Sequence, residues 1–179
     1  MLKRLFLAIP LNEKYLGSLK EFCESQGNLA GVKWTDGQNL HITLLFLGDV
    51  EERHIPSIVY NLKSKVTKPF YLLFKGLVLA PPGRPPRMIW AKFEKSNHFD
   101  KLVSAAYGQV QEFIQIALQK ESIPHVTLAR FKDYVDWRKI NLPQLKFKPL
   151  QVSMFYLMES TLTPRGPIYQ KLAEFKLNA

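Results

Sequence analysis

The sequence has one cysteine, no long apolar run, and fewer acidic than basic residues. Because Cys23 is alone, no disulfide can form within the chain, and we expect a reducing compartment, the cytoplasm. No apolar stretch approaches the ~20 residues that span a bilayer. Residues 1–10 place basic residues before an apolar run, as secretion signals do, but the run is too short and no small-residue cleavage site follows it. We therefore expect no membrane association.

The charge balance favours a polyanionic partner. The chain has 25 Lys and Arg against 15 Asp and Glu, which leaves a formal net charge of +10 at pH 7. A basic surface attracts phosphates at long range. A basic protein with no such partner has the same composition, so charge alone decides neither fold nor chemistry.

Length and hydrophobic content suit one domain, or two small lobes that share an interface. At 179 residues and 46% hydrophobic content, the chain can bury a sizeable core. Apolar residues at helical spacing follow the capping residue Asn12 and a second cap, either Ser96 or Asn97, and also occupy residues 55–66. Gly48 is expected to end the strand that precedes this last helix. The strand-like runs are residues 5–9, 40–47, 70–79, 88–93, 147–157 and 168–177.

Two apolar runs repeat one polar pattern, a histidine and a threonine separated by one residue. The first is HITLLFLG from His41, and the second is PHVTLARF, which contains His125. Because side chains alternate along a strand, His41 and Thr43 share one face, and so do His125 and Thr127. The two histidines are 84 residues apart, close to half the chain. This spacing suggests two similar lobes.

Two such strands facing one groove would surround a phosphate with two imidazoles and two hydroxyls. One imidazole can accept a proton while the other donates one, because the unperturbed pKa of histidine is about 6.5. A single histidine beside a threonine in a strand is more often a core or edge residue, and the repeat is what favours a site. Zinc is the rival interpretation, but neither motif supplies a third ligand. His54 and His98 are expected at helix starts, without a site role.

Taken in order along the chain, these motifs resemble those of the 2H phosphoesterase superfamily. Within it, the chain is similar to the bacterial and archaeal RNA 2′,3′-cyclic phosphodiesterases, first named 2′-5′ RNA ligases. The resemblance implies an α/β (α+β) fold with two pseudo-symmetric lobes, each an antiparallel sheet with outer helices, around a central groove. Residues 1–179 would form this single domain, with one His-x-Thr motif in each lobe. The matching stretches are RLFLAIP, VKWTDGQNLHITLLFLGDV, PRMIW, PHVTLARF and LMESTLTPRGPIYQKLAEFKL.

The resemblance also implies a reaction, the hydrolysis of a terminal 2′,3′-cyclic phosphate on RNA to a 2′-phosphate, without metal or cofactor. His125 would be the proton acceptor and His41 the proton donor, an assignment that periodicity alone leaves open. Thr43, Thr127 and Arg130 would bind the phosphate. The alternatives are a 2′-5′ RNA ligase and a non-catalytic protein that binds RNA ends. We expect a monomer whose partner is RNA with a cyclic phosphate end.

Arg130 poses a problem for this assignment. It lies five residues after His125, and strict alternation places it on the opposite face of the strand. A β-bulge between the two residues would bring it back to the face of His125. Otherwise Arg130 is a surface residue on a strand edge.

Overall fold

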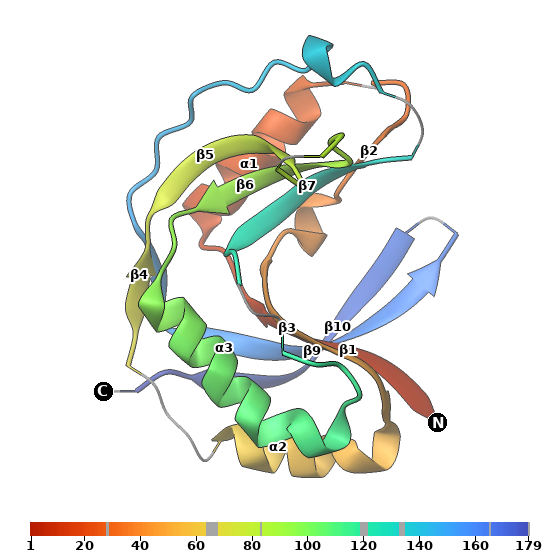
Figure 1. Ribbon diagram of the computed structural model, residues 1–179, viewed down its shortest axis with the longest axis vertical. Helices are drawn as coiled ribbons and strands as arrows, with labels where there is room; N and C mark the ends of the chain where they lie inside the picture. The colour runs from red at the N-terminus through yellow and green to blue at the C-terminus, as the bar shows by residue number, and fades with distance from the viewer. Residues whose placement is uncertain are drawn as a thin grey trace.

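The computed structural model describes residues 1–27, 29–63, 68–82, 84–118, 122–132, 135–164 and 166–178. Within these residues, one eight-stranded sheet dominates, and all its strand pairs are antiparallel. The sheet has two halves, named here after the strands that carry the motifs (Figure 1). The β3 half runs in the order β10 (Gly166–Lys176), β9 (Met154–Thr163), β1 (Leu2–Ile9), β3 (Ile42–Glu51). The β7 half runs in the order β7 (His125–Phe131), β6 (Met88–Phe93), β5 (Phe74–Ala80), and β2 (Val32–Trp34) pairs with β7.

The two halves are joined by a single pair of residues. Ile42 of β3 pairs with Val126 of β7, and the two strands pair nowhere else within the described residues. Beyond this pair, the free edge of β7 is covered by β2, from Ala129 to Phe131. The two halves therefore diverge from this pair, and Figure 1 shows β3 and β7 separating from each other.

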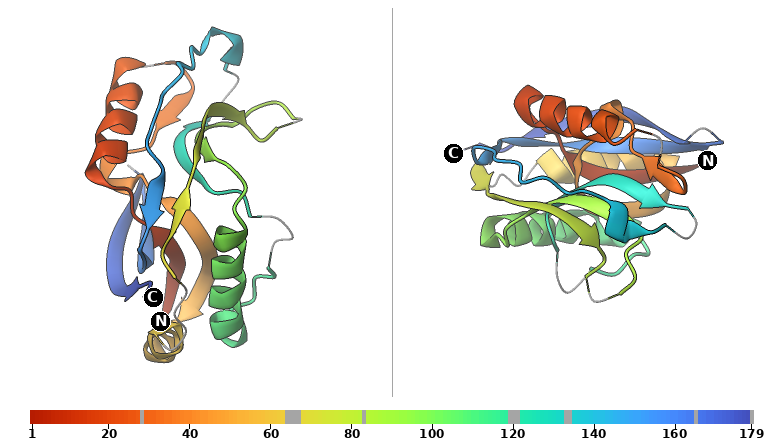
Figure 2. Two further views of the ribbon diagram at one scale, coloured as in Figure 1. Left: turned by 90° about the vertical axis from the view of Figure 1, so that its left-hand side faces the viewer. Right: turned by 90° about the horizontal axis from the view of Figure 1, so that it is seen from above.

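Three α-helices in the described part of the chain cover the sheet, and two of them cross from one half to the other. Helix α1 (Glu13–Ser25) follows β1 but packs on the β7 half, where Tyr15 stacks against Phe93 at a centroid distance of 5.8 Å. Helix α3 (Asn97–Val110) follows β6 but lies beside α2 (Ile55–Lys63) over the β3 half (Figure 2). Each half therefore combines segments from distant parts of the chain, and neither is simply the N-terminal or C-terminal part.

The two helix starts predicted from capping residues are confirmed. The Asn12 side chain accepts a hydrogen bond from the backbone N–H of Tyr15, and the Ser96 side chain accepts one from Phe99. The helix expected over residues 55–66 is α2, which ends at Lys63, and residues 64–67 lie outside the described part of the chain.

Three strand predictions need correction. The run at 70–79 is two strands, because β4 (Phe70–Leu72) leaves the main sheet to pair with β8 (Leu150–Val152). The run at 147–157 is divided in the same way between β8 and β9. Strand β3 does not end at Gly48, because this glycine adopts a φ of 76° and the strand continues to Glu51.

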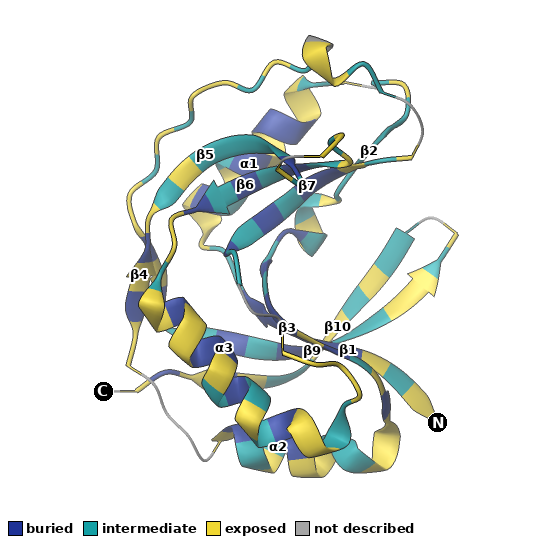
Figure 3. Cartoon of the chain, in the orientation of Figure 1, coloured by how far each residue is buried: buried dark blue, intermediate teal, exposed yellow. Residues whose placement is uncertain are grey.

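The core is built from the apolar positions between the polar ones. Ile42, Leu44, Val126 and Leu128 are buried, whereas the histidines and threonines of both motifs are only partly buried. Figure 3 shows buried positions running along both halves of the sheet and the inner sides of the helices. The mixed α/β architecture with antiparallel strands confirms the predicted fold class.

Candidate active site

The Ile42–Val126 pair brings the two motifs together. In an antiparallel pair with this register, His41 and Thr43 flank one member and His125 and Thr127 flank the other. The two buried side chains point into the core, so their polar neighbours project from the opposite face. The two motifs are thus related by an approximate twofold axis near this pair.

Both imidazoles are held by the same kind of hydrogen bond. His41 Nδ1 lies 2.7 Å from the carbonyl oxygen of Asn39, and His125 Nδ1 lies 2.8 Å from that of Ile123. A carbonyl only accepts, so Nδ1 carries the proton and Nε2 of the neutral ring is the acceptor. His41 Nε2 lies 3.1 Å from Thr43 Oγ1, which donates to it in that state. Each ring therefore presents Nε2 as the atom that can gain or lose a proton.

A β-bulge follows the threonine in both motifs. On β7, Trp90 pairs with Thr127 and Ile89 pairs with Ala129, so Leu128 is the extra residue. On β3, the pairing with β1 skips Leu44 in the same way. The extra residue makes two adjacent residues buried in each strand, Leu44 with Leu45 and Leu128 with Ala129. The exposed side chain that follows each buried pair is therefore again on the face of the histidine.

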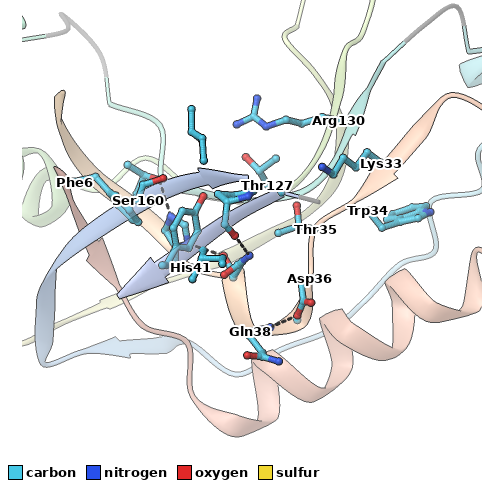
Figure 4. A pocket seen from close by; sticks show the side chains of 18 of the residues that line it. Phe6, Lys33, Trp34, Thr35, Asp36, Gln38, His41, Thr127, Arg130 and Ser160 are labelled. Carbon is cyan, nitrogen blue, oxygen red and sulfur yellow. Dashed lines mark hydrogen bonds between the residues drawn. The ribbon is translucent and has the colours of Figure 1, made fainter. Parts of the chain in front are cut away.

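The bulge in β7 resolves the position of Arg130. Arg130 is exposed, and it lines the same groove as Thr127 and His41 (Figure 4). Its guanidinium also donates to the sulfur of Met88, over 3.3 Å. The equivalent position after the bulge in β3 is Phe46, whose ring is 52% exposed and lines the same groove. One motif therefore presents a cation, and the other an aromatic ring.

The groove between the halves has a volume of about 1520 Å³. His41, Thr43, Thr127 and Arg130 line it, and His125 lies beside these residues at the start of β7. The hairpin of β9 and β10 forms one wall, and the Asn39 side chain donates to the carbonyl of Pro167 in that hairpin, over 3.0 Å. The structure thus brings all five predicted residues to one region.

Burial lowers the pKa of both motif histidines below 6.5. For His41, burial is the main cause, the Asn39 carbonyl opposes it, and the charge of His125 lowers the pKa further. For His125, burial again dominates, the Ile123 carbonyl opposes it, and Arg130 and Lys92 lower the pKa further. Both rings are consequently neutral at pH 7 in the free protein.

Aromatic side chains surround the two imidazoles, and reasoning from the sequence assigned none of them to the site. Trp90 stacks on His125 with ring centroids 3.8 Å apart and an interplanar angle of 24°. Phe6 lies 5.1 Å from the His41 ring, and Tyr169 meets that ring edge-on at 5.4 Å. Burial raises the pKa of Tyr169, which keeps its hydroxyl protonated. All three lie in stretches that carry the family resemblance, Phe6 in RLFLAIP, Trp90 in PRMIW and Tyr169 in LMESTLTPRGPIYQKLAEFKL, but that resemblance gave none of them a site role.

The remaining candidate groups lie outside the groove or are inert. His54 precedes α2 and His98 lies in the first turn of α3, as predicted. Burial raises the pKa of the Cys23 thiol to about 12, which fits a structural role. Among the described residues, no group of three His, Cys, Asp or Glu could hold a metal ion. The same part of the chain contains no helix of the length and apolar character that a membrane crossing needs.

Comparison with known proteins decides the family. The family model of LigT-like phosphoesterases matches residues 9–90. An RNA 2′,3′-cyclic phosphodiesterase of Thermotoga maritima is 32% identical over 177 residues, which cover 96% of this chain and 94% of the relative. The chain belongs to the LigT-like phosphoesterases. A second relative with the same name, from Archaeoglobus fulgidus, is 31% identical, and the match covers 97% of this chain and 99% of the relative.

Solved structures of LigT-like phosphoesterases share the fold. A protein of Thermus thermophilus superposes with a TM-score of 0.83 at 30% identity, over 97% of both chains. Escherichia coli LigT complexed with 3′-AMP has the same TM-score, 0.83, at 19% identity over the full length of both chains. The resemblance proposed from the two motifs is confirmed.

Proposed function

We propose that this LigT-like phosphoesterase is an RNA 2′,3′-cyclic phosphodiesterase, which hydrolyses a terminal cyclic phosphate to a 2′-phosphate. The observation that carries the proposal is the pair of His-x-Thr units around Ile42 and Val126, each with its histidine Nδ1 bonded to a carbonyl two residues earlier. Because a carbonyl holds Nδ1 of each ring, proton exchange is left to Nε2: a neutral ring can accept a proton there, and a protonated ring can give one up. The names of the full-length relatives support the same activity.

In the proposed reaction, His125 Nε2 takes a proton from water as the water oxygen bonds to phosphorus. His41 reacts as the imidazolium, a form that a bound phosphate anion favours. The bond from phosphorus to the 3′ oxygen breaks, and His41 Nε2–H gives that oxygen its proton. The assignment of acceptor and donor rests on the likeness to the family. Each proton transfer typically contributes about 10²–10⁴ in rate.

The other groove residues would bind the substrate. The hydroxyls of Thr43 and Thr127 donate to the non-bridging phosphoryl oxygens, and Arg130 supplies a charge-assisted donor. Phe46, exposed on the other side of the groove, offers a ring on which the terminal base can stack. The net charge of +10 suits an RNA partner. A monomer in the cytoplasm remains part of the proposal.

The test is the product formed from a defined oligonucleotide that ends in a 2′,3′-cyclic phosphate. We expect a 2′-phosphate and a free 3′-hydroxyl, resolved by chromatography against both synthetic isomers. A 3′-phosphate product would mean that the 2′ oxygen, and not the 3′ oxygen, is the leaving group. If a 5′-hydroxyl oligonucleotide is present and a 2′,5′-linked product predominates, the protein is a ligase. Binding of the RNA end without any product would identify a non-catalytic protein.

A further inference from the structure

The two halves of the site match residue by residue on the strands next to the motifs. Trp90 of β6 pairs with Thr127 of β7, just before the bulge, and Ala8 of β1 pairs with Thr43 of β3 at the same point. On the far side of each bulge, Met88 pairs with Arg130, and Phe6 pairs with Phe46. Positions 90 and 8 are therefore equivalent, and one carries a tryptophan where the other carries an alanine.

This difference makes the surroundings of the two histidines unequal. The Trp90 indole lies face to face with the His125 imidazole, at a centroid distance of 3.8 Å. Ala8 has no ring, and His41 instead meets Phe6 at 5.1 Å with a 35° tilt and Tyr169 edge-on. Tryptophan has the strongest attraction for a cation among the aromatic side chains, and a close stack directs its negative face toward the imidazole.

We propose that Trp90 is the positioning residue of the acceptor histidine: its indole face fixes the plane of the His125 ring and stabilises the imidazolium formed when His125 takes the proton of water. This inference rests on the proposed function, in which the proton that His125 takes comes from water. It deepens that function by giving a structural reason why His125, and not His41, is the acceptor. The twofold relation of the motifs supplies no such reason.

The charges around His125 leave this task to Trp90. The charged groups that face His125 among the described residues are Arg130 on β7, Lys92 on β6 and, when protonated, His41 on β3. All are cationic, and Arg130 and Lys92 add to burial, the main cause, in lowering the pKa of His125, which keeps it neutral in the free protein, as a base requires. None of them stabilises the imidazolium, so that stabilisation falls to the indole face, the Ile123 carbonyl and the bound phosphate.

The hydrogen bonding of Trp90 also favours a role for its face. The indole Nε1 is buried and has no partner among the described residues. An unpaired buried donor is unfavourable, and a leucine or phenylalanine at this position would avoid it. The contact of Trp90 with the His125 imidazole is therefore made by the indole face and not by its N–H.

The test is a pH titration of the histidine Hε1–Cε1 signals by NMR, without substrate. The chain has 4 histidines, and the missing signal in His125→Gln assigns His125. In Trp90→Leu, the pKa of His125 should fall by about 0.5 to 1 unit, and in Trp90→Phe by less. The matched control is Trp34→Phe, because Trp34 is also a partly buried tryptophan with an unpaired Nε1, on the strand that borders the other edge of β7. This control should leave the His125 titration unchanged.

The kinetic arm measures hydrolysis of a cyclic-phosphate oligonucleotide. The kcat of Trp90→Leu should fall about 3- to 10-fold, the rate equivalent of that shift, at unchanged KM, because the imidazolium forms only after binding. Trp90→Phe should recover part of the loss. An activity loss in which KM rises and the titration does not move would mark Trp90 as a packing or substrate-contacting residue and overturn the proposal.

The titration also separates this proposal from the proposed function. A wild-type protein inactive on cyclic phosphates refutes the function, whereas an unchanged His125 pKa in Trp90→Leu refutes the role of Trp90. If Trp90→Leu does not fold, Trp90→Phe is the test: a lower pKa of His125 supports the role of Trp90, and an unchanged or higher pKa refutes it. The wild-type spectrum supplies a further check, because a ring stacked at this distance moves the His125 Hε1 signal upfield. A signal at its random-coil position overturns the proposal.

Discussion

The maximum of kcat/KM should lie below pH 6.5. This parameter reports the free protein, in which one histidine must be neutral and the other protonated. Burial lowers the pKa of both His41 and His125 from 6.5, with the repulsion of neighbouring cations added. A bell-shaped profile has its maximum between the two pKa values, so the maximum falls on the acid side of 6.5.

The size of the effect on the alkaline limb follows from the same two pKa values. With a donor pKa at or below 6.5, at most about 1% of the donor is protonated at pH 8.5. When both pKa values equal 6.5, about a quarter of the molecules are in the active form at the maximum, so kcat/KM should fall by about 25-fold or more from its maximum to pH 8.5. The profile of kcat should be displaced to higher pH, because a bound phosphate anion favours the imidazolium form of the donor.

The assay is initial-rate hydrolysis of a cyclic-phosphate oligonucleotide between about pH 4.5 and 9, at fixed ionic strength. Fixed ionic strength matters because phosphate contacts weaken with salt. A maximum of kcat/KM above pH 7, or a flat profile up to pH 8.5, would refute the reasoning that burial controls the titration of these histidines.

Four further outcomes are expected. Arg130→Met should lower kcat/KM by about 10- to 100-fold, the loss of a charge-assisted bond, whereas Arg53→Met, on an exposed side chain outside the groove lining, should not change it. Phe46→Leu should raise KM by about tenfold with kcat retained, and an unchanged KM would remove Phe46 from base binding. Gly48→Ala should lower the free energy of unfolding by about 1–2 kcal/mol, measured by denaturant, because its φ is 76° and a Cβ would lie 2.8 Å from Ile116. The free energy of unfolding should fall as the pH drops below 6.5. The reason is that the unfolded chain then binds more protons than the folded one, whose histidine pKa values are lowered. Equal free energies of unfolding of wild type and His41→Gln at every pH in this range would contradict it.

Much of the site could be predicted because it depends on alternation along two strands. The pairing of His41 with Thr43 and of His125 with Thr127 needs only the period of a strand, and the buried Ile42 and Val126 follow from the same period. The position of Arg130 needed the bulge at Leu128, which periodicity admits but does not locate.

What the sequence could not provide comes from long-range pairing. Trp90 reaches His125 because β6 pairs with β7 in one register, and a shift of one residue would turn it to the other face. Tyr169 reaches His41 from β10, at the other end of the chain. The crossing of α1 and α3 to opposite halves, and the departure of β4 and β8 from the main sheet, are likewise tertiary choices that local patterns do not contain.

The most direct test of the account is the single-turnover rate of cyclic phosphate hydrolysis in EDTA for the wild type and its four single histidine-to-alanine variants. The account predicts full wild-type activity, losses of about 10²–10⁴-fold in His41→Ala and His125→Ala, and wild-type rates in His54→Ala and His98→Ala. Loss of wild-type activity in EDTA, or undiminished rates in His41→Ala and His125→Ala, would contradict two-histidine catalysis.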